Sequence, residues 1–593
     1  MCGIVGYIGQ KECSGILIEE LKKLEYRGYD SVGIAVLNNG GVSLLKKKGR
    51  VVGIEEDALK IQGKIGIGHT RWATHGVPCD KNSHPHKAGK FTVVHNGIIE
   101  NFLQLKIELV NEGYKFLSET DTEVVAQLLS KNYNGNFLET VNKTTKMLNG
   151  SYALAIICED FSDRIIIAKK DNPIIIGKGN NEFFVASDIP AIASYTKNIY
   201  LLDDNEFAIL KEDSCEFYDN DLNAITKELK YIDIDEDSLG TAGYESYMLK
   251  EINEVPSSMI DTATFLQTMK LPENLLDKLK NASKILITGC GTAYHSGLVG
   301  KYIIEKLNRV PVDIDIASEL RYKNPIVDNK TVVVAVSQSG ETADTIAAVK
   351  LLKKEGAYII SITNVLYSSL TTFADFTLHL KAGTEIGVAA TKSYNCQLVA
   401  FYYLAELIAK ANNKNLNLLN EVFVASEKIN EILSNYTKIN KLAKKYSNCS
   451  SVFFLGRGVD YPVALEGSLK LKEISYMFSE GYASGELKHG PLALIERGTL
   501  AVVLMTQEDL LEKSMNCIHE VQSRGATVLV LSQYKNKDLM KEVDEYFVLP
   551  KVSDDIMPLI EIVPLQLFSY YMARGRGFDP DKPRNLAKSV TVE

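Results

Sequence analysis

The chain has 593 residues, more than one hydrophobic core accommodates, so we expect several domains. Its 45% hydrophobic and 24% charged residues are typical of a globular protein, and its net charge of −9 argues against binding to nucleic acid. No apolar run has the length of a membrane span, and the N-terminus lacks a signal-peptide pattern, so we expect no membrane partner. The nine cysteines are scattered and never spaced as CxxC, which indicates a reducing compartment, and we predict a cytoplasmic protein.

The first 215 residues contain many short β-type runs, such as KFTVVHNGII and SYALAIICED. Helices are predicted over 14–25 and 121–130. Several adjacent strands with few helices favour stacked antiparallel sheets flanked by helices. The polar and acidic stretch 216–244 is predicted to be a linker.

The second half changes character, because short apolar strands such as 284–289 and 331–336 each precede a Gly/Ser-rich turn and a helix. This alternation predicts parallel sheets with helices on both faces. Gly289 matches Gly456, and Gly356 matches Gly525 at nearly the same offset, which indicates a duplicated α/β domain. We therefore expect the following parts: domains over 245–425 and 435–580, and a C-terminal tail over 581–593.

The chain begins MCGIVGYIGQ, with a cysteine directly after the initiator methionine. An internal free cysteine is usually a small buried hydrophobic residue. At position 2, however, removal of Met1 would leave a thiol and a free α-amine on one residue. An amine with a pKa of roughly 7.7–8.0 can accept the thiol proton, so Cys2 is a candidate nucleophile that needs no histidine.

HTRWATHG (69–76) and VVHNG (93–97) supply what such a nucleophile requires. Arg71 can hold a substrate carboxylate, and the side chain of Asn96 with the N–H of Gly97 can form an oxyanion hole. Asp121 can receive a substrate ammonium, although alone it would more simply cap the following helix. Trp72, the only tryptophan, would by itself more often be a core residue.

Five histidines lie close together in this part of the sequence: His69, His75, His84, His86 and His95. They lack acidic or cysteine partners at metal-ligand spacing, so we expect no metal. No nucleotide or other cofactor motif is found, and we expect no cofactor.

SQSGETADT (337–345) follows a predicted strand and opens a helix. The hydroxyls of Ser337, Ser339 and Thr342, with backbone N–H groups at the helix start, form an anion cradle that suits a sugar phosphate better than a nucleotide. A plain Ser-rich turn is the simpler alternative. The second copy reads TQEDLL (506–511) at this place and lacks the loop.

Glu466, Lys470 and Glu473 share one face of a predicted helix, where such a pattern is usually a solvated charge ladder. His489 follows in a loop, a position suited to acid–base chemistry. Lys588 stands in a tail that would ordinarily fray, but its flanking small and apolar residues indicate packing.

Taken together, these motifs resemble the glutamine–fructose-6-phosphate aminotransferase (isomerizing) family, also called glucosamine-6-phosphate synthases, almost from end to end. MCGIVGYIG, EYRGYDS, HTRWATHG, HNGIIEN and SETDTE are similar to its class-II, N-terminal-nucleophile glutaminase domain, a four-layer αββα fold. CGTAYHSG, SQSGETADT, GTEIGVAATKS, GRGVDYPVALEGSLKLKEISY, GELKHGPLALI and PRNLAKSVTVE are similar to its two tandem sugar isomerase (SIS) domains, which are parallel-sheet α/β sandwiches.

The resemblance implies the site roles. Cys2 would attack the glutamine amide, with Asn96 and Gly97 stabilising the oxyanion. Glutamine would be bound by Arg71, Trp72, Thr74, His75 and Asp121, with Trp72 also gating a channel for ammonia. Lys588 would form a Schiff base with fructose 6-phosphate, His489 would assist ring opening, and Glu473 would move the proton between C1 and C2. The sugar phosphate would be held or lined by Thr292, Ala293, Ser337, Gln338, Ser339, Thr342, Glu466, Lys470 and Arg584.

The resemblance also implies a homodimer. Ala293 and Ala390 stand where the family is expected to have serine, each removing a hydroxyl worth about 1 kcal/mol per hydrogen bond. Three other functions compete: an amidotransferase making phosphoribosylamine or asparagine, a non-catalytic SIS regulator, and a deglycase or an amidotransferase acting on another sugar phosphate. The first lacks a diphosphate or ATP motif, and a regulator would not need Cys2 or Lys588.

Overall fold

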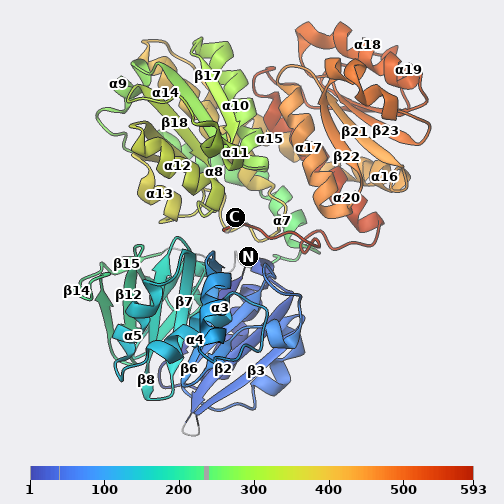
Figure 1. The fold of residues 1–593 in the computed structure, drawn as a ribbon. Helices are drawn as coiled ribbons and strands as arrows, with labels where there is room; N and C mark the ends of the chain where they lie inside the picture. The colour runs from blue at the N-terminus through green and yellow to red at the C-terminus, as the bar shows by residue number, and fades with distance from the viewer. Residues whose placement is uncertain (1, 39–40, 233–239, 592–593) are drawn as a thin grey trace. The chain divides into compact units, whose positions relative to one another are not determined.

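A computed structural model describes residues 2–38, 41–232 and 240–591 (Figure 1). The chain forms two compact units, Met1–Leu239 with Ala587–Glu593, and Gly240–Leu586. Within the described residues, no helix combines the length and the apolar character that crossing a bilayer requires.

The first unit contains two antiparallel sheets. The eight-stranded sheet has the order β15 (Lys230–Tyr231), β11 (Asn198–Leu201), β9 (Ile175–Lys178), β10 (Phe183–Ala186), β1 (Gly3–Ile8), β4 (Ile65–Arg71), β2 (Ser31–Asn38) and β3 (Gly41–Lys48). The seven-stranded sheet has the order β14 (Ala224–Ile225), β13 (Cys215–Tyr218), β12 (Glu206–Leu210), β8 (Phe161–Lys170), β7 (Gly150–Cys158), β6 (Phe91–Ile99) and β5 (His86–Ala88).

The layers of this unit follow from its hydrophobic clusters. One cluster joins Ile4 and Ile67 of the first sheet to Val94 and Ala155 of the second, so the sheets pack face to face. Two further clusters bury the outer faces under helices. These helices are α1 (Cys13–Lys23), α2 (Glu55–Ala58), α3 (Phe102–Asn111), α4 (Thr122–Asn132), α5 (Phe137–Thr145) and α6 (Ile189–Ile192). The predicted αββα arrangement is confirmed, since both sheets bury two faces.

The second unit contains two five-stranded parallel sheets. Their orders are β17 (Val312–Ile316), β16 (Lys284–Gly289), β18 (Thr331–Val336), β19 (Tyr358–Thr363), β20 (Phe376–His379), and β22 (Ser479–Ala483), β21 (Ser451–Gly456), β23 (Thr499–Leu504), β24 (Thr527–Ser532), β25 (Glu545–Val548). In both sheets the second strand of the copy lies at one edge and the first lies beside it. The identical strand order confirms the duplication predicted from the matched glycines.

Helices cover both faces of each parallel sheet, as predicted (Figure 1). They are α7 (Tyr247–Asn253), α8 (Val255–Thr268), α9 (Leu275–Lys280), α10 (Thr292–Asn308), α11 (Ala317–Leu320), α12 (Ala343–Lys354), α13 (Ser369–Phe373), α14 (Lys392–Ala411), α15 (Leu418–Ser434), α16 (Tyr436–Lys445), α17 (Asp460–Ser475), α18 (Leu511–Gln522), α19 (Leu539–Glu542) and α20 (Met557–Gly575). One large core is shared by the inner faces of both sheets and the helices between them.

The stretch 216–244, predicted to be a linker, carries short strands in its first part. Most of β13, and all of β14 and β15, lie within it and extend the two sheets of the first unit. Its residues 233–239 lie outside the described residues. The helix predicted over 14–25 is α1, and the one predicted over 121–130 is α4.

Candidate active sites

Cys2 lies at the start of β1, beside the end of β4. Gly3 of β1 is paired with Thr70 of β4, which brings the next residues of β4 close to the thiol. The backbone N–H of Trp72 donates to Cys2 Sγ at 3.3 Å. Burial raises the pKa of the Cys2 thiol, while the Trp72 amide and the charge of Arg71 act in the opposite direction. The thiol therefore needs a nearby proton acceptor before it can attack.

Asn96 reaches Cys2 from β6 of the facing sheet, and Gly97 follows it on the same strand. Asn96 Nδ2 donates to the Cys2 carbonyl oxygen at 3.0 Å, so the two predicted catalytic residues meet. Gly97 has φ of +131°, and a Cβ there would lie 2.0 Å from the Ser151 carbonyl oxygen. Only glycine fits this backbone. The Asn96 amide thus places an N–H donor beside Cys2, which is the kind of group that an oxyanion hole requires.

The end of β4 and the segment after it carry the predicted glutamine-binding residues other than Asp121. Arg71 is buried; its Nη2 donates to the carbonyl oxygens of His75 and, at 3.0 Å, Gly76, while its Nη1 has no hydrogen-bond partner among the described residues. Thr74 is exposed. The ring of Trp72 is half-buried and packs edge-to-face on Tyr29 at 5.8 Å, so it is not a core residue.

Asp121 precedes α4 but does not cap it with its side chain. Its Oδ2 instead accepts from the backbone N–H of Ile99 at 2.9 Å, at the end of β6. The simpler alternative, in which Asp121 only caps a helix, is therefore wrong. Its carboxylate is anchored on the strand that carries Asn96.

Four of the five neighbouring histidines are buried, while His75 is half-buried. The rings of His69 and His84 stack at 4.0 Å, and His86 packs edge-on against His84 at 4.8 Å. Burial lowers the pKa of His69 to about 3 and holds the pKa values of His84, His86 and His95 below the usual range, so the rings are neutral. Among the described residues, no group of three or more potential ligands has the geometry of a metal site.

In the second unit, the loop 337–342 follows β18, and Thr292 begins α10 directly after β16. These strands are neighbours at the point where the strand order reverses, and α/β sheets bind ligands at the carboxyl ends of such strands. Ser337 Oγ lies 2.8 Å from Thr342 Oγ1 and accepts from the Gly340 N–H at 3.0 Å. These bonds shape a loop whose backbone amides open α12, as an anion cradle requires.

A buried polar cluster lies on α10 and α17, where Thr292 joins it. Glu466 Oε1 accepts from Thr292 Oγ1 at 2.9 Å, and Lys470 Nζ lies 3.4 Å from the same carboxylate oxygen. Glu466 is 0% and Lys470 is 1% exposed, so the expected solvated charge ladder is wrong for these two residues. Burial alone would lower the pKa of Lys470, but the charges of Glu466 and Glu473 overcome it and raise that pKa.

The remaining predicted residues are less enclosed. His489 is exposed at the end of a short 3₁₀ helix, Ser484–His489. The guanidinium of Arg584 lies 4.1 Å from the ring centroid of Tyr476, whose hydroxyl accepts from the Arg584 N–H at 2.7 Å. Lys588 is half-buried and belongs to the first unit, whereas Glu473 belongs to the second, so their shared site stays a prediction.

Comparison with known proteins matches both halves. A glutamine amidotransferase domain model matches residues 69–194, and a SIS domain model matches 278–407 and 445–574. The chain is 50% identical to the glutamine–fructose-6-phosphate aminotransferase (isomerizing) of Caldanaerobacter subterraneus subsp. tengcongensis and 44% identical to that of Aquifex aeolicus, covering 100% of every chain compared. The chain belongs to the glutamine–fructose-6-phosphate aminotransferase (isomerizing) family.

Solved structures agree with this for the second unit. The C-terminal domain of the Francisella tularensis aminotransferase is 36% identical, with a TM-score of 0.55, and spans 58% of this chain and 99% of its own. A tagatose-6-phosphate ketose/aldose isomerase from Escherichia coli, 18% identical with a TM-score of 0.52, spans 58% of this chain and 97% of its own, and shares the fold.

Sequence reasoning missed three residues at the sites of this aminotransferase-family chain. His295 Nδ1 lies 2.8 Å from Glu466 Oε2, and its place one turn after Thr292 could have revealed it. Arg27 Nε donates to the Cys2 carbonyl oxygen at 3.3 Å from within the EYRGYDS motif. His69 lies 3.2 Å from the Asn96 side chain, although only a metal role was considered for it.

In the second SIS copy, which lacks the SQSGET loop, the side chain of Asp460 binds to the segment at the equivalent place. Asp460 follows Gly456 as Ala293 follows Gly289, at the carboxyl end of the equivalent strand. Its carboxylate accepts from the backbone N–H of Thr506 at 3.0 Å and from the Thr506 hydroxyl at 2.6 Å. Burial raises the pKa of Asp460 to about 6, although these hydrogen bonds oppose the rise. A carboxylate thus occupies donors at the place where the first copy has its cradle.

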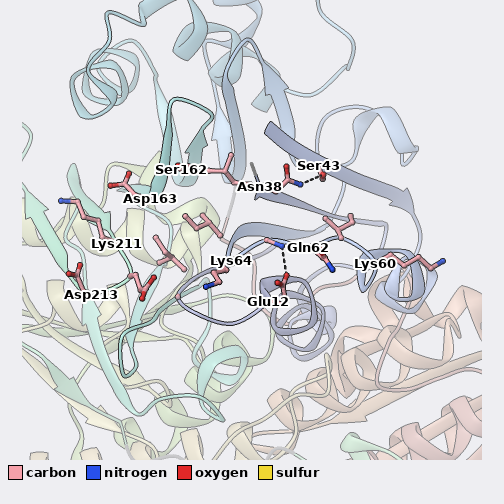
Figure 2. A pocket seen from close by; sticks show the side chains of 17 residues that line it. Glu12, Asn38, Ser43, Lys60, Gln62, Lys64, Ser162, Asp163, Lys211 and Asp213 are labelled. Carbon is pink, nitrogen blue, oxygen red and sulfur yellow. Dashed lines mark hydrogen bonds between the residues drawn. The ribbon is translucent and has the colours of Figure 1, made fainter. Parts of the chain in front are cut away.

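Figure 2 shows a pocket of about 1170 Å³ in the first unit, lined by residues that include Glu12, Lys64, Asp163 and Lys211. It lies at the end of β1 marked by Ile8, whereas Cys2 precedes the other end. Its lining carries both signs of charge and none of the predicted site residues. The pocket is therefore separate from the glutaminase site.

Proposed function

We propose that this chain transfers the amide nitrogen of glutamine to fructose 6-phosphate, giving glucosamine 6-phosphate and glutamate. One observation carries the proposal: Cys2 lies beside the amide donor of Asn96 in one unit, and the other unit holds both an anion cradle and a buried Glu–Lys cluster. The family supports this combination over its full length. The comparisons do not favour the alternative, a deglycase or an amidotransferase for another sugar phosphate.

In the glutaminase reaction, removal of Met1 frees the α-amine of Cys2, which accepts the thiol proton. The thiolate attacks the amide carbon, and Asn96 and Gly97 stabilise the resulting oxyanion. Collapse of this intermediate releases ammonia and leaves a thioester that water hydrolyses to glutamate. Arg71 binds the glutamine carboxylate and Asp121 its ammonium group. Trp72, Thr74 and His75 complete the binding segment, with Trp72 gating the ammonia channel.

In the isomerase reaction, the loop residues hold the phosphate and His489 assists opening of the sugar ring, which exposes the ketose carbonyl. Lys588 condenses with this carbonyl to form a Schiff base and water, and ammonia then displaces the lysine. Glu473 moves the proton between C1 and C2 to give the aldose. The sugar phosphate is held or lined by Thr292, Ala293, Ser337, Gln338, Ser339, Thr342, Glu466, Lys470 and Arg584.

Ammonia passes directly between the two sites, because in water it would mostly become ammonium and lose its nucleophilic lone pair. We further infer a homodimer through the isomerase halves, as the family resemblance implies, and a cytoplasmic location. All nine cysteines are free, which suits a reducing compartment. The proposed domains are residues 1–215, 245–425 and 435–580, with a linker over 216–244 and an active-site tail over 581–593.

The test is incubation of the purified chain with L-glutamine and fructose 6-phosphate, followed by detection of glucosamine 6-phosphate and glutamate in equal amounts. Glucosamine 6-phosphate alone serves as the opposing substrate. Release of ammonia from it without aminotransfer would favour the deglycase. Absence of glucosamine 6-phosphate with other sugar phosphates aminated instead would replace the proposed acceptor.

A further inference from the structure

The orientation of the Asn96 amide is fixed by its two neighbours. Its Nδ2 lies 3.0 Å from the Cys2 carbonyl oxygen, an atom that only accepts, so the NH₂ group faces Cys2. Its Oδ1 therefore points the other way, where His69 Nε2 lies at 3.2 Å. His69 Nε2 also lies 3.0 Å from the His95 carbonyl oxygen. Because both neighbours are acceptors, this nitrogen carries the proton and donates to them.

The His69 ring is held as a neutral donor. The side chain is fully buried, and burial lowers its pKa to about 3, so it carries one proton at neutral pH. The ring stacks on His84, whose Nδ1 accepts from the His95 N–H at 3.4 Å. The two rings thus bond the backbone of His95, the residue that precedes Asn96 on β6.

The Nδ1 atom of His69 supports the donor role of its Nε2 atom. His69 Nδ1 is buried and has no hydrogen-bond partner among the described residues. A buried acceptor without a partner is costly, so packing alone would be better served by an apolar side chain. What the histidine contributes here is the donor at Nε2.

We propose that His69 is a positioning residue for glutamine hydrolysis: its Nε2–H holds Asn96 Oδ1 and thereby turns the Asn96 NH₂ group toward the oxyanion formed beside Cys2. An asparagine amide can rotate by half a turn, and its oxygen would then face the oxyanion and repel it. The inference rests on the oxyanion role proposed for Asn96.

Substitution His69→Leu removes the donor and retains a side chain of similar bulk. We expect kcat for glutamine hydrolysis to fall by about 10- to 100-fold, somewhat less than the loss of a whole oxyanion donor, with KM for glutamine changed less than about twofold. His69→Gln keeps an N–H donor and should recover most of kcat. The control is His86→Leu, another buried ring of the cluster, which contacts the Thr120 hydroxyl instead of Asn96.

A double-mutant cycle separates positioning from general damage. Asn96→Ala should lower kcat by itself, and His69→Leu added to it should cause no further loss. Equal losses from His69→Leu in both backgrounds, or an equal loss in His86→Leu, would overturn the positioning role. An unchanged kcat in Asn96→Ala would instead contradict the proposed role of Asn96. If His69→Leu does not fold, the same cycle is run with His69→Met, which also lacks the N–H donor but has a more adaptable side chain.

A transition-state analogue gives an independent readout. A γ-aldehyde analogue of glutamine forms a hemithioacetal with Cys2 and presents its oxygen to Asn96. His69→Leu should lower the affinity for this analogue by the same factor by which it lowers kcat/KM, while the affinity for glutamate stays unchanged. Equal weakening of both ligands would mean that His69 only supports the binding pocket.

Discussion

The ammonium of Lys470 lies 2.7 Å from the carboxylate of Glu473, almost one turn further along α17. The other carboxylate near Lys470 belongs to Glu466, which is fully buried. Substitution Lys470→Met leaves the negative charge of Glu466 without its buried cation. We expect the second unit to lose about 3–5 kcal/mol of unfolding free energy, measured by chemical denaturation.

The matched control is Lys470→Met with Glu466→Gln, which removes both charges together. It should recover part of the lost stability, because a neutral amide then replaces the buried carboxylate that lost its partner. If the double variant is as unstable as Lys470→Met, the loss comes from packing and not from an unpaired charge.

Cys2→Ala removes the proposed nucleophile without changing the strand that follows. Glutamate release from glutamine should be abolished. Binding of fructose 6-phosphate, measured by calorimetry, should be retained because the cradle lies on another unit. Retained glutaminase activity would refute the assignment of Cys2. A preparation that still carries Met1 should also be inactive in amide cleavage, because the nitrogen of Cys2 is then an amide and cannot accept the thiol proton. Mass spectrometry together with the assay would check this.

Gly97→Ala tests the backbone of the oxyanion hole. The added Cβ would lie 2.0 Å from a carbonyl oxygen at φ of +131°, so we expect a cost of about 1–3 kcal/mol and a fall of at least about tenfold in kcat. The control is Gly113→Ala, where φ is +95° and nothing lies within 4 Å of the added atom. Comparable losses of activity in both variants would show that strain alone, away from the site, is responsible.

Lys588 is tested by chemical trapping. Borohydride added with fructose 6-phosphate should reduce the Schiff base and attach the sugar phosphate to the C-terminal peptide, as mapped by mass spectrometry. Lys588→Arg, which keeps the charge but cannot form the imine, should show no label. Labelling of Lys470 or another lysine would overturn the role of Lys588.

Asp460 predicts a pH dependence of stability. Its pKa is about 6 in the folded chain against 3.8 ordinarily, so the folded state binds the proton more tightly than the unfolded state. The contribution of Asp460 to the free energy of unfolding of the second unit should therefore fall by about 3 kcal/mol as pH rises from about 4 to 6, and change little above that. Chemical denaturation across this range should show a flatter profile in Asp460→Asn. Asp509→Asn, which removes an exposed carboxylate three residues after Thr506, should leave the profile unchanged.

Local sequence patterns predicted the elements well, because strand and helix signals reside in neighbouring residues. The apolar runs 284–289 and 331–336 are β16 and β18 without a shift of boundary. The same patterns could not give the burial of Glu466, since the residues that enclose it come from α10, far away in the sequence. Its contacts with Thr292 and His295 arise only when the two SIS copies pack on one core.

The glutaminase site shows the same limit. The motifs predicted that Asn96 and Cys2 cooperate, and the distance between them confirms that they meet. A histidine beside them suggested only a metal ligand, because a sequence does not reveal which ring nitrogen faces which acceptor. The anchoring of Asp121 on Ile99 was likewise hidden, since a residue before a helix is ordinarily its cap.

The carboxylate of Asp460 makes the two SIS copies unequal in their capacity to bind an anion. The second copy supplies its own carboxylate to the donors at this place, so they are not available to an anionic ligand. In the first copy, Ala293 takes the place of Asp460, so the donors of the equivalent loop have no such carboxylate from this position and are open to a bound anion. Duplication thus left one copy with an anion-binding loop and one without it, and titration of the chain with fructose 6-phosphate should saturate at one equivalent per polypeptide.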